Sequence, residues 1–212
     1  MSERDVIVGM TGASGAIYAQ AVVREMLAQG LTVHFIPTVH AGVVWQNEMD
    51  MPTTPTAAER QIAPAPSWAA RLNIPPGSFE RLVVYDDGDV GSEPASGTFR
   101  ARGMVVVPCS MNTLAKIAHG IADTLLTRAA GVCLKERRPL VLVPRETPLS
   151  LADLRNQVAA AEAGAIVLPA SPAFYHRPVE IGDLVHSIVS RVCNQLGLPC
   201  EQPIRYTKQR SG

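Results

Sequence analysis

Five segments of the sequence combine hydroxyl, small and charged residues, and each directly follows a short apolar run. They are TGASGA (11–16), PTVHAG (37–42), PCSMNT (108–113), PRETP (144–148) and PASPAFYHRP (169–178). If the apolar runs are parallel strands, these segments share the carboxyl edge of one sheet, where open α/β sheets bind ligands. Turn chemistry explains Gly, Pro and Ser at such places, but not hydroxyls at four strand ends with Arg145 and Glu146 at the fifth. The pattern predicts a functional crevice at this edge.

The segment TGASGA has the composition of a phosphate-binding turn. Gly12 and Gly15 allow a tight turn, Ser14 adds a hydroxyl, and free N–H groups follow at a helix start. The alternative is an ordinary strand-to-helix turn. The motif is not GxGxxG, and Thr38 stands where a dinucleotide-binding protein has an acidic residue. A second hydroxyl-rich turn, with Ser110 as a helix N-cap, favours FMN over a dinucleotide.

Charged side chains near the predicted crevice are open to two interpretations. Arg145 follows an apolar strand and suits a phosphate, and Glu146 is either its ion-pair partner or an acid–base group. In KERRP, Arg137 and Arg138 are typical of a solvated helix end that complements the helix dipole. Taken alone, Glu48, Tyr175 and Arg191 are ambiguous. His40, His119 and His176 lack metal-ligand spacing and each favours a structural role, and the four cysteines form no CxxC pair.

The elements that must position these residues alternate along the chain. Strands are predicted over residues 5–10, 31–37, 79–85, 103–107, 140–143 and 165–168, and helices over 17–29, 40–47, 111–119, 124–136 (with Asp123 as its cap), 151–163 and 181–196. This alternation predicts a parallel sheet. We expect one domain over residues 1–212, with an irregular, proline-rich excursion over 49–93. Short helices are predicted near 57–61 and 67–72, and a poorly ordered tail over 199–212.

The composition excludes several classes of function. The 19 basic and 19 acidic residues give a net charge of +0, which supplies no field for nucleic acid. Aromatic residues make up 5%, too few for a base-stacking platform. No apolar stretch approaches a membrane span, and the N-terminus is not a signal peptide, so we expect a cytoplasmic protein. Charged residues are only 18%, against about 25% typically, which indicates apolar surface buried between subunits.

Together the motifs resemble those of the flavin prenyltransferases of the UbiX type. The matching pieces are GMTGASGAIYA (9–19), EPASGT (93–98), the block 105–150 and GAIVLPASPAFYHRP (164–178). The resemblance covers most of the chain except residues 49–89 and the tail. It implies a flavodoxin-like (Rossmann-like) three-layer α/β sandwich with a mostly parallel sheet. It also implies a homododecamer with active sites at subunit interfaces.

The resemblance further implies a reaction. Enzymes of this family join the dimethylallyl group of dimethylallyl monophosphate to N5 and C6 of reduced FMN, without a metal. The product, prenylated FMN, is the cofactor of UbiD-type decarboxylases. Clustered cations suit this chemistry because they stabilise the charge that develops on the departing phosphate.

Site residues carry over from the resemblance position by position. Those that contact FMN are Gly12, Ala13, Ser14, Thr38, Ser110, Met111, Asn112, Thr113 and Arg145. Ser14 and Glu48 serve proton transfers near N5. The prenyl phosphate is surrounded by Lys135, Arg145, Glu146, Tyr175 and Arg191, and Ser96 and Gly97 line the prenyl side. Ser14, Glu48, Lys135 and Glu146 are the catalytic set, with Glu146 assisting proton traffic.

Departures from the family pattern keep two alternatives open. Thr38 replaces the usual Ser, Asn112 replaces a small residue, and His40 is unexpected. The same superfamily contains FMN-dependent cysteine decarboxylases, which rely on an active-site His, but so dense a phosphate site argues against that activity. The other alternative is a non-catalytic FMN-binding subunit of a decarboxylase complex, which would not require Glu48 or Lys135.

Overall fold

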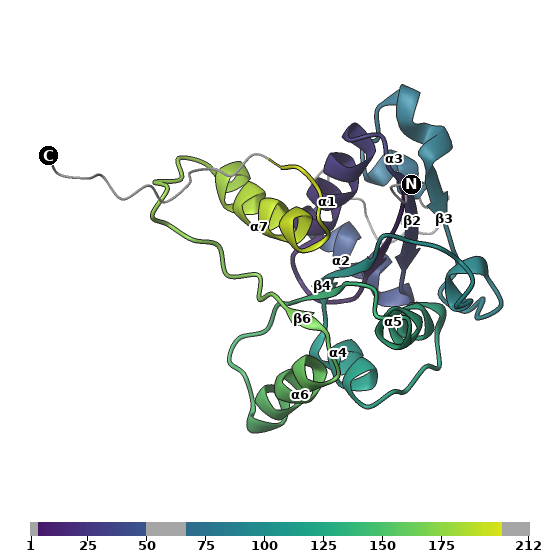
Figure 1. Ribbon diagram of the computed structural model, residues 1–212. Helices are drawn as coiled ribbons and strands as arrows, with labels where there is room; N and C mark the ends of the chain where they lie inside the picture. Colours follow the sequence, from purple (N-terminus) through teal and green to yellow (C-terminus); the bar gives the residue numbers. More distant parts are fainter. Residues whose placement is uncertain (1–3, 50–66, 201–212) are drawn as a thin grey trace, which may run out of the picture.

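The structure, a computed structural model, describes residues 4–49 and 67–200 and is built around one twisted sheet (Figure 1). The strands are β1 (Asp5–Met10), β2 (Thr32–Pro37), β3 (Leu82–Val84), β4 (Met104–Cys109), β5 (Leu140–Pro144) and β6 (Ile166–Val167). Their order is β3-β2-β1-β4-β5-β6, and every neighbouring pair is parallel. The predicted parallel α/β fold is confirmed.

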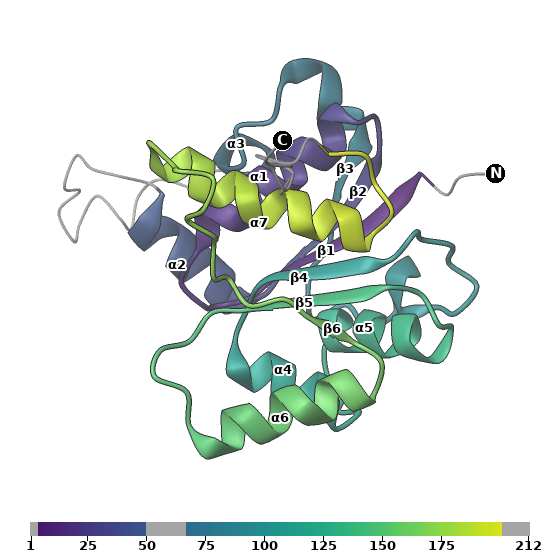
Figure 2. The ribbon, with the colours of Figure 1, turned by 60° about the vertical axis from the view of Figure 1, so that its left-hand side comes forward.

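Helices cover both faces of the sheet (Figure 2). One face carries α1 (Ala16–Ala28), α2 (Val39–Glu48), α3 (Trp68–Arg71) and α7 (Ile181–Gln195), and the other carries α4 (Met111–Ala118), α5 (Leu125–Lys135) and α6 (Leu151–Glu162). Alternate strand residues enter the two cores, so Val6 and Val8 face α1 while Ile7 faces α5. Because both faces of the sheet are buried, the strand sequences are continuous apolar runs.

The predicted elements differ from the structure mainly at their ends. The strand expected over 79–85 is limited to Leu82–Val84, and a 3-10 helix, η2 (Pro76–Arg81), precedes it. A short 3-10 turn, η3 (Glu93–Ala95), lies near the end of the predicted excursion. The helix expected near 57–61 and the tail beyond residue 200 lie outside the described residues.

Helix α5 begins one residue later than expected. The prediction of Asp123 as its N-cap is wrong, because Thr124 is the N-cap and forms a capping box with Thr127. Asp123 instead accepts a hydrogen bond from Lys116 Nζ at 2.6 Å. No helix within the described ranges is long and apolar enough to cross a bilayer.

The strand order places a crevice between β1 and β4. The chain passes from β1 to β2 on one side and later enters β4 on the other, and ligands of such sheets bind where the order reverses. Thr11 links the two strand ends: its hydroxyl donates to the carbonyl of Pro108 at 2.7 Å and accepts from the N–H of Ser110 at 2.8 Å. The two loops that follow β1 and β4 are thereby held side by side.

Candidate functional site

A cavity of about 410 Å³ opens at the carboxyl edge of the sheet. It is lined by the loops that follow β1, β2 and β4, by the start of α5 and by Asp87. Its volume lies in the range of about 300–1,000 Å³ that small-molecule sites occupy. The cavity therefore coincides with the crevice that the strand order predicts.

Two helix N-termini face this cavity. Thr38 caps α2 by accepting from the N–H of Ala41 at 3.3 Å, and Ser110 caps α4 by accepting from the N–H of Thr113 at 3.3 Å. The N–H groups of a first helical turn have no intrahelical acceptor, so they are available to an anion. The predicted cap at Ser110 is confirmed, and the donor set fits a phosphate with its attached polyol.

The cavity gathers part of the predicted flavin-binding set: Gly12, Thr38, Ser110, Asn112 and Thr113. Ala13 and Met111 are buried, and the side chain of Met111 packs in the core beneath α4. Only the backbone of Met111 is therefore placed to meet a ligand. The assignment of all nine residues of the predicted set as FMN ligands stays a prediction.

Several lining residues were missed from the sequence: Val39, Asp87, Lys116, Thr124 and Thr127. His40, for which the sequence favoured a structural role, also lines the cavity. Asp87 falls in the irregular excursion, where the sequence gives no periodicity. Thr124 and Thr127 carried a usable signal, since a Thr just before an apolar helix is a common N-cap.

Ser14, Glu48 and Arg145 meet next to this cavity. The Glu48 carboxylate accepts from the N–H of Gly15 at 2.9 Å and from that of Ala16 at 2.8 Å. Gly15 caps α1 in a left-handed conformation (φ 116°) and has no side chain to cap with, so Glu48 supplies the missing acceptor from the end of α2. Arg145 Nε donates to the carbonyl of Ser14 at 3.1 Å. The sequence prediction placed these three residues in one site, and the structure brings them together.

The charge state of Glu48 follows from these contacts. Burial alone would raise the pKa of Glu48, but hydrogen bonds from the Ser14 side chain and from the two N–H groups, with the nearby Arg145, hold it below its ordinary value. Glu48 is therefore an ionised acceptor at neutral pH. Its contact with the Ser14 side chain orients that hydroxyl just before α1.

Glu146 and Tyr175 lie on the same edge of the sheet but are open to solvent. The Glu146 carboxylate accepts from the N–H of its neighbour Thr147 at 3.1 Å. Tyr175 is 69% exposed in the long loop between β6 and α7 (Figure 1). Within residues 4–49 and 67–200, neither side chain forms a hydrogen bond or ion pair with Glu48.

The remaining predicted residues lie toward the opposite, amino edge, with Lys135 and Arg191 on helices that cover opposite faces of the sheet. A methyl group placed on Gly97 would lie 3.2 Å from Lys135 Nζ, so Ser96, Gly97 and Lys135 form one cluster. Lys135 ends α5 just before β5 begins, whereas Arg145 follows β5, and the strand separates them by about 16 Å. Arg191 is exposed near the end of α7, whose Leu196 packs beside Gly103 at this same edge. One chain therefore does not bring the predicted prenyl-phosphate ligands together.

The interpretation of Arg138 as a solvated residue is wrong. Its guanidinium donates to the carbonyls of Gly97 and Phe99, 41 and 39 residues away along the chain. Arg138 thus fixes the loop that carries Ser96 and Gly97. The adjacent Lys135 and Glu136 form a surface ion pair at 3.6 Å.

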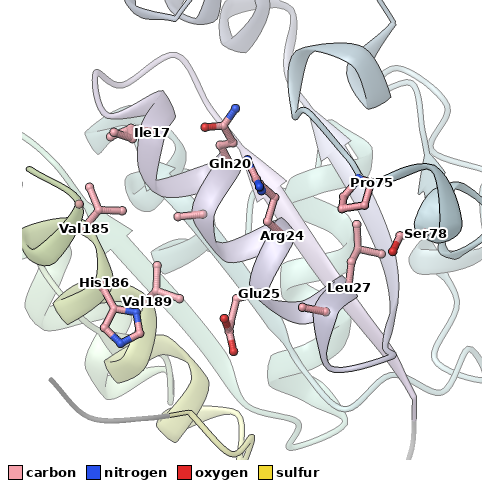
Figure 3. Close-up of a pocket in the computed structure, with 13 residues that line it drawn as sticks. Ile17, Gln20, Arg24, Glu25, Leu27, Pro75, Ser78, Val185, His186 and Val189 are labelled. Atoms are coloured by element: carbon pink, nitrogen blue, oxygen red, sulfur yellow. The ribbon is translucent and has the colours of Figure 1, made fainter.

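A second hollow, of about 480 Å³, lies between α1 and α7 (Figure 3). Gln20, Arg24 and Glu25 from α1 face it, and Val185 and Val189 from α7 close its apolar side. It contains no residue of the predicted site and lies within the helix layer. In the described ranges, no three His, Cys, Asp or Glu side chains are grouped as a metal site requires.

Comparison with known proteins assigns the family. The Flavoprotein family model matches residues 1–193. A flavin prenyltransferase UbiX from Synechocystis sp. is 44% identical over 197 residues, which cover 92% of each protein. This chain belongs to the UbiX flavin prenyltransferases of the Flavoprotein family. The UbiX enzyme of Escherichia coli K12 is 38% identical over 194 residues, which cover 91% of this chain and 92% of that enzyme.

Solved structures of the family share the fold. AnUbiX, crystallised in complex with FMN and dimethylallyl pyrophosphate, has a TM-score of 0.79 at 34% identity, covering 98% of this chain and 100% of that one. A dodecameric FMN-dependent UbiX-like decarboxylase from Escherichia coli O157:H7 has a TM-score of 0.78 at 36% identity, covering 96% and 100%. The cysteine decarboxylase TvaF, at 18% identity and a TM-score of 0.58, shares the fold alone. The family assignment thus favours the prenyltransferase over the decarboxylase alternative.

Proposed function

We propose that this chain transfers a dimethylallyl group from dimethylallyl monophosphate to reduced FMN, giving prenylated FMN. The observation that carries the proposal is the group formed by Ser14, Glu48 and Arg145 beside a cavity with two helix N-termini. It sits in a chain of the UbiX family, whose members are named for this reaction. When bound, reduced FMN supplies the nucleophilic N5 and C6 atoms that accept the prenyl carbon atoms.

The residues of the cavity bind and orient the flavin. Thr38 and Ser110 present hydroxyls and first-turn N–H groups to its phosphate and ribityl chain. Gly12 allows the loop after β1 to pack against the start of α2, since a methyl group there would lie 2.5 Å from the Cβ of His40. The flavin ring then extends toward Ser14 and Arg145, where the chemistry takes place.

Glu48 and Ser14 serve the transfer of the proton from flavin N5. As the bond from N5 to carbon forms, the Ser14 hydroxyl would pass the N5–H proton to the Glu48 carboxylate, which also holds that hydroxyl in place. The prenyl C–O bond breaks and its electron pair leaves with the phosphate. Arg145 stabilises the charge on that phosphate, and Glu146 takes part in the later proton transfer.

The prenyl-phosphate site is completed by a second copy of the chain. Ser96, Gly97, Lys135 and Arg191, which we call the amino-edge group, come from a neighbouring subunit of a homododecamer. The loop that leads into α7 supports such an assembly, because Phe174, Tyr175, Val179 and Ile181 are between 68% and 94% exposed. Apolar side chains so exposed typically mark a protein interface.

The product and the location of the protein are part of the proposal. Prenylated FMN passes to UbiD-type decarboxylases, which use it as a cofactor. No disulfide joins any of the four cysteines, all of which lie in the described residues, and this supports a reducing compartment and therefore the cytoplasm. Metal independence follows from the family resemblance.

An anaerobic assay tests the function. The protein is incubated with reduced FMN and dimethylallyl monophosphate, or the pyrophosphate in a parallel reaction, and the flavin is analysed by mass spectrometry. We expect the flavin to gain one isoprene unit (C5H8), with the better donor identified by the faster reaction. Bound but unchanged FMN with both donors would instead indicate a non-catalytic flavin-binding subunit.

A further inference from the structure

His40 lies in the flavin cavity but has no role in the function proposed above. It is the second residue of α2 and lines the cavity beside Gly12 and Thr38. The base of its side chain packs on the glycine loop, because a methyl group on Gly12 would lie 2.5 Å from the Cβ of His40. Its exposed imidazole makes no hydrogen bond or ion pair within residues 4–49 and 67–200.

The other charged side chains that line the cavity already have partners. Lys116 Nζ lies 2.6 Å from the carboxylate of Asp123, which neutralises it. The Asp87 carboxylate accepts from the N–H of Leu126 at 2.8 Å, at the N-terminus of α5. Of the titratable residues lining this cavity, His40 is therefore the one whose ring is still available to a ligand.

The position of His40 determines which part of a bound flavin it can contact. The reacting end of the flavin must lie near Ser14 and Arg145, which follow β1 and β5. Thr38 follows β2, which is three strand spacings, or about 14 Å, from β5. The phosphate end therefore lies at the N-terminus of α2, within the first turn that also carries His40.

We propose that His40 is a ligand of the flavin phosphate and makes this chain discriminate FMN from riboflavin. A ring N–H of His40 donates to a phosphate oxygen, and such hydrogen bonds to a charged group are stronger than neutral ones. The inference rests on the proposed function, because it takes the orientation of the flavin from the site of prenyl transfer. It adds a residue that selects the phosphorylated form of the flavin.

Binding titrations with two flavins test this role. Dissociation constants of oxidised FMN and riboflavin are measured by quenching of flavin fluorescence for the wild-type protein and for His40→Ala. Alanine keeps the Cβ that packs on Gly12 and favours the helix, so the variant is expected to fold. His119→Ala is the matched control, because His119 is an exposed imidazole at the end of α4, where it contacts Asn156 instead of the cavity.

The two ligands separate the possible results. We expect His40→Ala to weaken FMN binding about tenfold, while riboflavin binding changes by less than about twofold. His40→Gln, which keeps a donor, should recover part of the loss, and His119→Ala should change neither constant. Equal weakening of both flavins would mean that His40 contacts the ring or ribityl chain and would overturn the proposal. So would no change with either flavin. If the wild-type protein bound no FMN, the proposed function would be overturned as well. This result differs from failure of the His40 proposal alone, in which the wild-type protein still binds FMN.

Discussion

The two edges of the sheet carry different halves of the proposed active site. At the carboxyl edge, Glu48 and Arg145 are tied to the loop after β1 by hydrogen bonds of 2.8–3.2 Å. At the amino edge, Arg138 holds the loop of Gly97 beside Lys135. Each half is organised within the chain, but β5 separates them by about 16 Å.

The difference indicates how the protein assembles its site. A carboxyl edge of one copy must meet the amino edge of another, and such a contact uses two different surfaces. Contacts of this kind are heterologous and close into rings when the rotation between copies allows it. The exposed apolar loop before α7 and the low charge content both suit extensive contacts between copies. Under the proposed function, the flavin half of the site is complete in one chain, while the prenyl-phosphate half requires a neighbour.

The largest expected effect comes from inactivating one edge at a time. Glu146→Gln and Lys135→Ala should each lower the rate of prenyl transfer about 100-fold or more, since each removes a group that acts on the departing phosphate or its proton. FMN should remain bound in both variants, because neither residue lines the flavin cavity. Mass spectrometry of the flavin product measures the rate.

Co-expression of the two variants with different affinity tags then tests whether the site is shared. In mixed oligomers, some sites combine an intact carboxyl edge from one chain with an intact amino edge from the other, which should restore about a quarter of the wild-type rate. The matched control mixes Glu146→Gln with Glu48→Gln. Both changes lie on the carboxyl edge, so no site is repaired. Absence of recovery in the first mixture would show that both edges act within one chain.

The fold was predictable because the strands are buried on both faces of the sheet. Their sequences are therefore continuous apolar runs that can be recognised. Helix and strand bounds agree within a few residues, and Ser110 was identified as a cap from its type and position. The carboxyl-edge site was predictable for the same reason, because parallel strands bring their ends together. The family resemblance supplied the roles of individual residues.

What the sequence could not provide were contacts between distant segments. Glu48 caps α1 across 32 residues because Gly15 has no side chain to do so, and no local pattern records that arrangement. Arg138 was misinterpreted since a basic residue after a helix usually faces solvent, whereas its carbonyl partners lie in a loop 39–41 residues earlier. The separation of the two edges became visible only with the strand order.

A smaller effect is expected from Glu48→Gln, which tests the preorganised half of the site. The amide oxygen can still accept both N–H groups, as Oε2 does, but the NH2 group that replaces Oε1 cannot accept a hydrogen bond and the negative charge is lost, so Ser14 loses its fixed orientation. The rate of prenyl transfer should fall about 10- to 100-fold, with FMN affinity nearly unchanged. Mass spectrometry and fluorescence titration give the two values. Glu80→Gln, an exposed carboxylate outside both groups, is the control.

The same variant gives a dependence of stability on pH. Because the pKa of Glu48 is lowered in the folded chain, the ionised carboxylate stabilises the fold above its ordinary pKa of 4.5, and this contribution is lost as pH falls below that value. The wild-type protein should therefore exceed Glu48→Gln in free energy of unfolding at pH 7, and the two should converge in acid. Denaturant titrations at both pH values measure this difference. A difference independent of pH would show that the carboxylate charge does not stabilise α1.

The smallest effect is expected in a hydrogen-bonded network that runs from Tyr85, just after β3, through β2 to Asp5 at the start of β1. His34 lies between Asp5 at 3.0 Å and the Tyr85 hydroxyl at 2.9 Å, and that hydroxyl donates to Glu93 at 3.1 Å. Burial, with the hydrogen bond to Glu93, raises the pKa of Tyr85 above its ordinary value, so the phenol keeps its proton at neutral pH. The network thus joins β1, β2 and η3 just before the amino-edge group.

Tyr85→Phe removes the central hydroxyl and leaves the ring nitrogen of the buried His34 without that partner. We expect a loss of about 1–3 kcal/mol in the free energy of unfolding, and only a modest fall in prenyl transfer. The affinity for FMN should change little, because the Tyr85 hydroxyl contacts His34 and Glu93 and Tyr85 does not line the flavin cavity. Glu93→Gln keeps an acceptor and should cost less. If Tyr85→Phe weakened FMN binding as strongly as it lowers stability, the two edges would be coupled within one chain, and their independence would be disproved.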